Sequence, residues 1–285
     1  LWMHLLLLAL LVWLFTALSR GSREWMSPES RDGNADQVLR HPYAAALVVS
    51  LLLSFFIYPN APLTLYRWSL LLMVFPLLRV LSGRLSREDL SNVYVLTGFY
   101  LLRRLDGLFT SNDLIFRGYI LILTIMTAAA AYWGTRAGRQ AFTAGTGPWR
   151  RARRSLLRMG IALLLGSLIA NIVGYVALAT LFTQACISSA YAAAAFFAGV
   201  LAVEGFLLPL SRSPLTRKSF SFRDHGEILR RHISRVIRFA AVMAWVAATL
   251  VSFGLFAPFL AWLSSELSRR WSFGKATFSL GGIFL

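Results

Sequence analysis

Long blocks of apolar side chains recur along this chain of 285 residues. Apolar residues make up 57% of the sequence and charged residues only 14%, and the apolar residues gather in runs rather than in the one-sided stripes of a soluble helix. A run of about 18 to 25 apolar residues can cross the roughly 30 Å hydrocarbon core of a bilayer as a helix. We therefore predict an integral membrane protein whose main partner is the lipid bilayer.

About eight segments have the length and hydropathy of a membrane-spanning helix. They cover residues 1–19, 43–58, 63–80, 90–109, 114–134, 159–183, 186–209 and 236–263. No segment alternates polar and apolar residues as a barrel strand does, and open sheets cannot cross lipid because their edges stay unpaired. The predicted fold is all-α, a polytopic bundle of transmembrane helices.

The same pattern divides the chain into five parts. Residues 1–134 hold the first five spans, and residues 159–210 form a transmembrane hairpin. A predicted basic cytoplasmic loop, 135–158, separates these two parts, and a second one, 211–235, follows the hairpin. The final part, 236–285, holds the last span.

Basic charge is the second strong feature, with a formal net charge of +17. The 29 Lys and Arg residues lie between the apolar runs, so they indicate membrane topology, and no nucleic-acid partner is expected. With eight crossings, 22 of the 29 fall on one side of the membrane. Because basic loops are retained in the cytoplasm, we predict a multi-pass protein whose N-terminus lies outside.

No catalytic or metal-binding pattern is visible. The four histidines, His4, His41, His225 and His232, are scattered, and no familiar nucleophile, phosphate-loop or metal motif surrounds them. The single cysteine, Cys186, cannot form a disulfide or a Cys-x-x-Cys site within one chain. We expect no enzyme activity, no bound metal and no cofactor.

Polar and small residues inside the predicted spans are the candidate functional residues. Glu204 is the only acid within an otherwise apolar span, which favours either a relay function or pairing with a nearby Arg, with pairing preferred because the residue lies near a span end. Asn171 lies in mid-span and can bond across helices. Gly166, Ala170 and Gly174 recur every four residues and predict a close packing seam, which is either static or able to slide under tension.

Two further sets of residues are candidates for movement and lipid contact. Gly254 and Pro258 interrupt the last span and could kink or hinge it. Five arginines in one basic stretch either hold anionic lipid headgroups or serve only to set topology. They are Arg150, Arg151, Arg153, Arg154 and Arg158.

Several stretches resemble the membrane region of large MscS-like mechanosensitive channels, the multi-span relatives of the potassium-dependent type. The marks are Tyr100–Leu105, Arg117 at the start of a span, Asn171–Tyr175, Ser188–Tyr191, and the tail with Phe253–Leu255 and Trp271–Ile283. The resemblance covers most of residues 63–285 and implies that the final part, 236–285, also holds the start of the channel region, where the first of the family's three channel helices begins near Thr277.

This resemblance implies a membrane paddle that senses tension in the bacterial inner membrane. The resemblance implies a homoheptamer that releases ions and osmolytes on hypo-osmotic stress, and the family's pore helix and cytoplasmic β domain are not within these 285 residues. Two other functions stay open. A secondary transporter would need charged groups at the membrane midplane, and a membrane-embedded enzyme would need acids or histidines converging on one face.

Overall fold

The computed structural model describes residues 2–25, 38–58, 62–83, 85–109, 112–141, 148–212, 220–268, 270–273 and 276–279. Within these ranges the chain forms eleven helices and one short antiparallel hairpin of strands. The helices are α1 (Trp2–Trp25), α3 (Pro42–Ile57), α4 (Leu63–Leu72), α5 (Val74–Leu81), α6 (Arg87–Arg103), α7 (Asp106–Phe109), α8 (Asp113–Ala141), α9 (Pro148–Val173), α10 (Val176–Arg212), α12 (Phe220–Ser252) and α13 (Phe256–Ser268).

Five stretches of helix in the described part of the chain are long and apolar enough to cross a membrane. They are Trp2–Ser22, Asp113–Gly134, Ser155–Val173, Val176–Leu210 and Ile228–Ser252. The polytopic helical membrane architecture is thereby confirmed by length and composition, with five candidate spans where about eight were predicted.

The other three predicted spans differ for physical reasons. α3 has only 16 residues, or about 24 Å of helix, which is short for a 30 Å hydrocarbon core. In the predicted span at 63–80 the apolar helix covers only Trp68–Leu81, which is too short to cross the hydrocarbon core. α6 begins with Glu88 and Asp89 in its first turn, which lowers its hydropathy.

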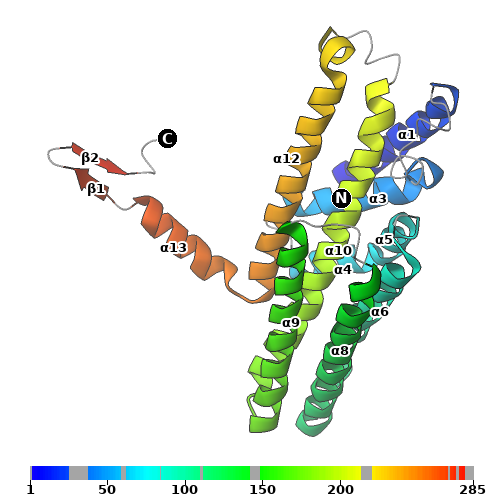
Figure 1. The fold of residues 1–285 in the computed structure, drawn as a ribbon. Helices are drawn as coiled ribbons and strands as arrows, with labels where there is room; N and C mark the ends of the chain where they lie inside the picture. The colour runs from blue at the N-terminus through cyan, green and yellow to red at the C-terminus, as the bar shows by residue number, and fades with distance from the viewer. Residues whose placement is uncertain are drawn as a thin grey trace.

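The long helix α10 is the centre of the molecule (Figure 1). It contacts α1, α3, α5, α6, α8, α9 and α12. Its many small residues allow these close approaches, and Ala195, Ala198 and Ala202 are almost fully buried. One half of α10 packs on α1 and α3, as the stacking of Phe15 on Phe206 at 4.5 Å shows, and the other half packs on α8 and α9.

The sixth and seventh predicted spans meet at Gly174, not near residue 185. Gly174 has a φ of +105°, a left-handed conformation that glycine adopts without strain. The Tyr175 N–H donates to the Ala170 carbonyl at 2.8 Å, and the Gly174 N–H donates to the Asn171 carbonyl at 3.2 Å. This Schellman motif ends α9, so α10 begins early and runs through Gln184, whose polarity had suggested a boundary.

The last predicted span is likewise divided at a glycine. Gly254 has a φ of +70°, and the N–H of Leu255 donates to the carbonyl of Leu250 at 2.8 Å. α12 therefore ends in a second Schellman motif, and α13 departs from the bundle in a new direction (Figure 1). Pro258 lies in the first turn of α13, where a proline is tolerated and does not kink the helix.

Parts of the two predicted basic loops are helical. α8 continues to Ala141 and α9 begins at Pro148, so both ends of 135–158 are helix. α12 begins at Phe220, well inside 211–235. Arginine is a good helix former, so hydropathy marks where a helix leaves the apolar layer and not where the helix ends.

The C-terminal described segment forms strands where a helix was expected near Thr277. β1 (Arg270–Phe273) pairs antiparallel with β2 (Ala276–Ser279), and Trp271 is opposite Phe278. Aromatic and β-branched side chains favour such extended pairing. The all-α prediction holds for the bundle but not for this hairpin.

Candidate functional site

Charged and amide side chains form three polar contacts between helices, and these contacts are the candidate functional site. One contact joins α10 to α12, one joins α8 to α9, and one joins the α6–α7 segment to α10. A charged group in a membrane bundle is costly unless it is paired, so such contacts are the first places to look for function.

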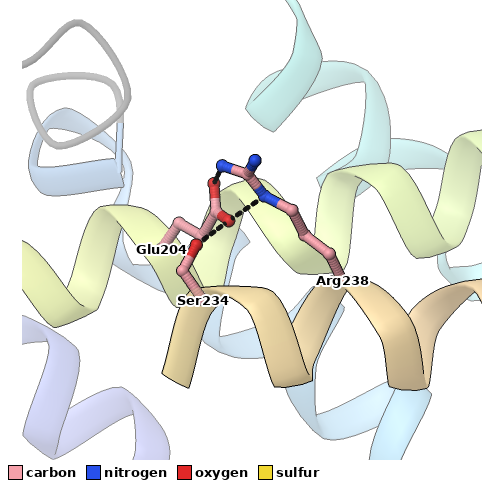
Figure 2. A network of polar contacts seen from close by, with 3 residues as sticks. All are labelled: Glu204, Ser234 and Arg238. Atoms are coloured by element: carbon pink, nitrogen blue, oxygen red, sulfur yellow. Dashed lines mark hydrogen bonds and ion pairs between the residues drawn. The ribbon is translucent and has the colours of Figure 1, made fainter. Parts of the chain in front are cut away.

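Glu204 on α10 is held by two residues of α12 (Figure 2). Arg238 donates from Nε to Glu204 Oε1 at 2.6 Å and from Nη2 to Oε2 at 3.1 Å, and Ser234 Oγ also donates to Oε1. Ser234 and Arg238 are four residues apart and so lie on one face of α12. The carboxylate is only 12% exposed, whereas the Arg238 side chain is 66% exposed. Glu204 is therefore the less exposed partner of the ion pair, and Arg238 is the more exposed one.

Arg117 of α8 caps the end of α9. Its Nη2 donates to the carbonyl oxygens of Asn171 at 2.7 Å and Ile172 at 3.0 Å, and its Nε donates to Asn171 Oδ1 at 3.3 Å. Asn171 Nδ2 donates back to the Arg117 carbonyl at 3.3 Å. The last carbonyls of a helix have no hydrogen-bond partners within the helix, and the helix dipole is negative at this end. The Arg117 guanidinium donates hydrogen bonds to these carbonyls and places a positive charge beside the negative end of the dipole.

Asn171 consequently has a different setting from the predicted one. It is almost fully buried but lies three residues before the turn at Gly174, not in mid-span. Its side-chain bond crosses to another helix, as its amide chemistry suggested, and the partner is Arg117.

The third contact surrounds the end of α6. Arg103 donates from Nη1 to Ser188 Oγ and from Nη2 to Gln184 Oε1 at 3.5 Å. Gln184 Nε2 in turn donates to Asp106 Oδ2 at 2.7 Å. Arg103 thus bonds to α10 inside the bundle.

Arg104 also points inward, onto a pair of stacked tyrosines. Its guanidinium lies 4.9 Å from the centre of the Tyr100 ring and donates from Nη2 to the Tyr100 hydroxyl. Tyr100 stacks on Tyr191 of α10 at 3.9 Å, and the Tyr191 hydroxyl donates to the Leu70 carbonyl at 2.9 Å. These rings tie α4, α6 and α10 together.

A buried set of hydroxyls joins α8, α9 and α10 without any charge. Thr183 Oγ1 lies 2.7 Å from both Thr124 Oγ1 and Ser167 Oγ, and all three side chains are almost fully buried. Ser167 also donates to the Ala179 carbonyl at 2.8 Å. Every hydroxyl has a partner, which makes this a rigid contact rather than a binding site.

The predicted seam of small residues is divided in the structure. Ala170 is buried beside Ile120 and Ala179, and a methyl group added at Gly166 would lie 3.9 Å from the Phe182 ring, an ordinary contact distance. Gly174 is exposed, and a Cβ built on it would have no other atom within 4 Å. It forms the turn and takes no part in helix packing.

Of the five arginines proposed to contact lipid, only Arg158 has a described side chain. It is exposed on α9. The backbone of the other four belongs to the first turns of α9, but their side chains lie outside the described residues: Arg150, Arg151, Arg153 and Arg154.

Sequence reasoning missed two of these partnerships. It named Arg117 and Asn171 separately but did not pair them, although a charge and an amide within spans are both expected to seek partners. It also missed the Tyr100–Tyr191 stack, for which no local pattern exists. Among the described side chains no group of three or more His, Cys, Asp or Glu residues could hold a metal ion. No family model, no curated protein and no solved structure matches this chain.

Proposed function

We propose that this chain is the tension-sensing membrane region of a mechanosensitive channel of the large MscS-like type. The observation that carries the proposal is the small buried share of the outer spans. In the candidate spans of α1, α8, α9 and α12, the share of residues that are buried is 17%, 17%, 22% and 0%, against 44% for α10. Four outer helices therefore keep few residues buried around one central helix, which leaves apolar side chains available for contact with lipid.

Such an arrangement suits a response to bilayer thickness. Tension thins the bilayer, and each lipid-facing helix of fixed length then incurs a mismatch cost of a fraction of a kcal/mol per Å. Summed over several helices and over the subunits of an oligomer, this cost reaches several kcal/mol, which is enough to shift a two-state equilibrium.

The junction at Gly254 supplies the connection through which tilt would be transmitted. α12 is the outer helix with the least buried span, and α13 follows it directly through the glycine turn. A change in the tilt of α12 would swing α13 and the hairpin that follows it. In the channel we propose, this end of the chain leads toward the pore, in a homoheptamer of the bacterial inner membrane that passes ions and osmolytes.

A secondary transporter is the alternative, and one observation favours it. Arg103, Asp106 and Gln184 bring two charges and an amide together inside the bundle. Charged groups facing a bundle interior often mark a substrate or ion pathway. A transporter would lose uptake on Asp106→Asn, whereas a tension sensor would keep its currents.

Patch-clamp recording from the full-length product that contains this chain tests the proposal. Membrane patches from bacterial spheroplasts without other mechanosensitive channels would be stretched by graded suction. We expect tension-activated currents, and we expect Gly254→Ala to shift the tension threshold while the matched change Gly118→Ala, at a helical glycine with open space around it, does not. Patches that stay silent up to rupture would reject the proposal, and substrate uptake by the same protein would favour the transporter.

A further inference from the structure

Three arginines form a stripe on one face of α12. Arg231, Arg235 and Arg238 are spaced by four and then three residues, which places them on the same side of the helix. All three are exposed. From Phe239 to Ser252 the helix contains no charged residue, so the stripe ends where the apolar part of the span begins.

One member of the stripe is held in place from the neighbouring helix. Glu204 accepts hydrogen bonds from Nε and Nη2 of Arg238, and Nη1 is left on the side of the guanidinium away from the carboxylate (Figure 2). A guanidinium fixed in this way loses little further conformational freedom when it binds an anion.

Exposed apolar side chains continue the stripe into the lipid layer. Phe239, Val242 and Met243 are 66%, 42% and 47% exposed and follow Arg238 within about two turns. Val242 lies on the same face as the arginines. A ligand with an anionic head and an apolar tail would therefore contact both parts of this surface.

We propose that Arg231, Arg235 and Arg238 bind the headgroup of an anionic phospholipid in the leaflet at this end of α12, and that Glu204 positions Arg238 for it. Guanidinium groups are well suited to phosphate because they donate paired hydrogen bonds to its oxygens. The apolar continuation of the stripe selects a lipid over free phosphate. The site does not depend on whether the protein conducts ions.

Lipid binding by the purified full chain tests this proposal. The protein would be placed in nanodiscs of phosphatidylcholine with increasing phosphatidylglycerol, and bound phosphatidylglycerol would be counted by native mass spectrometry. A guanidinium in direct contact with the lipid headgroup contributes about fivefold to such binding, so Arg231→Gln/Arg235→Gln is expected to lower affinity by more than tenfold. The control Arg20→Gln/Arg87→Gln removes the same charge at two other exposed sites and is expected to change affinity less than twofold.

Glu204→Gln separates positioning from simple charge. If the surface attracted lipid by net charge alone, removal of the Glu204 carboxylate would strengthen lipid binding. If Glu204 orients Arg238, the same change weakens lipid binding, and this is the expected result. An equal loss in the control pair, stronger binding by Glu204→Gln, or competition by inorganic phosphate at the same concentration as the lipid would each overturn the proposal. Should the Gln pair not fold, Arg231→Lys/Arg235→Lys keeps the charge, and weakened binding would still be required.

Discussion

Arg117 and Asn171 bond to each other in both directions across 54 residues of chain, side chain to side chain and side chain to backbone. The contact joins the first turns of α8 to the last turn of α9. It satisfies carbonyls that lipid could not, and it places a positive charge at the negative end of a helix dipole.

Removing this cap should destabilise the bundle. Arg117→Ala deletes three donated hydrogen bonds, and a hydrogen bond from a charged group contributes about 1.5 to 3 kcal/mol at most. Water or lipid headgroups replace part of the cap. We therefore expect the free energy of unfolding to fall by about 2 to 3 kcal/mol in total. The stability of Arg117→Lys should lie between that of the unaltered protein and that of Arg117→Ala. Reversible unfolding in mixed micelles measures the difference, and Arg158→Ala, at an exposed site on α9, should change stability by less than about 0.5 kcal/mol.

Gly174 should tolerate no other residue without strain. Its φ of +105° is outside the range of ordinary L-residues, so Gly174→Ala should cost about 1 to 2 kcal/mol. Gly160→Ala, inside α9, has open space and should be neutral or stabilising by up to about 1 kcal/mol. Thermal unfolding of the two variants side by side measures this contrast, and equal effects would mean that the turn does not depend on glycine.

These contacts show how far the sequence predicts the structure. Apolar runs predicted helices in a membrane, and the sequence singled out Gly254 as a helix interruption and Glu204 as an acid that needs a partner. Gly174 was expected in a packing seam, but it forms the turn after α9. The boundary at Gly174 was missed because hydropathy records the polarity of Gln184 and not the backbone conformation of a glycine. The partner of Asn171 could not be predicted, because two residues that meet through tertiary packing leave no local spacing between them.

The ion pair on α10 should respond unequally to loss of its two partners. Arg238→Gln leaves a carboxylate that is only 12% exposed, whereas Glu204→Gln leaves a guanidinium that is already 66% exposed. We expect Arg238→Gln to cost about 1 to 3 kcal/mol and Glu204→Gln less than about 1 kcal/mol. The double variant should resemble Glu204→Gln alone. Unfolding of all four proteins in one micelle system completes the cycle, and a larger cost for Glu204→Gln would contradict the assignment of Glu204 as the less exposed partner.

His41, at the start of α3, should stay neutral to lower pH than an ordinary histidine. Burial, followed by the charges of Arg79 and Arg40, lowers the pKa of His41 below its ordinary value of 6.5. The unfolded chain then takes up the proton first, so this residue makes the fold less stable as pH falls below about 6.5. Histidine-labelled NMR titration should show the low pKa and a rise toward 6.5 in Arg79→Gln. Arg87→Gln is the control, and an unchanged pKa in both variants would remove Arg79 as a cause.

Gly199 of α10 lies against Leu52 of α3. A Cβ built on Gly199 would lie 2.2 Å from Leu52 Cδ1, so Gly199→Ala requires the leucine to move. Because Cδ1 is the far end of a flexible side chain, the cost should be about 1 to 3 kcal/mol and not a failure to fold. Leu52→Ala removes the obstacle, so the double variant should be more stable than the sum of the two single effects by about 1 kcal/mol. Gly118→Ala combined with Leu52→Ala should be additive, since Gly118 has open space around it. Additive effects for Gly199 and Leu52 as well would mean that α3 is free to shift away from α10, as a helix that moves under tension would be.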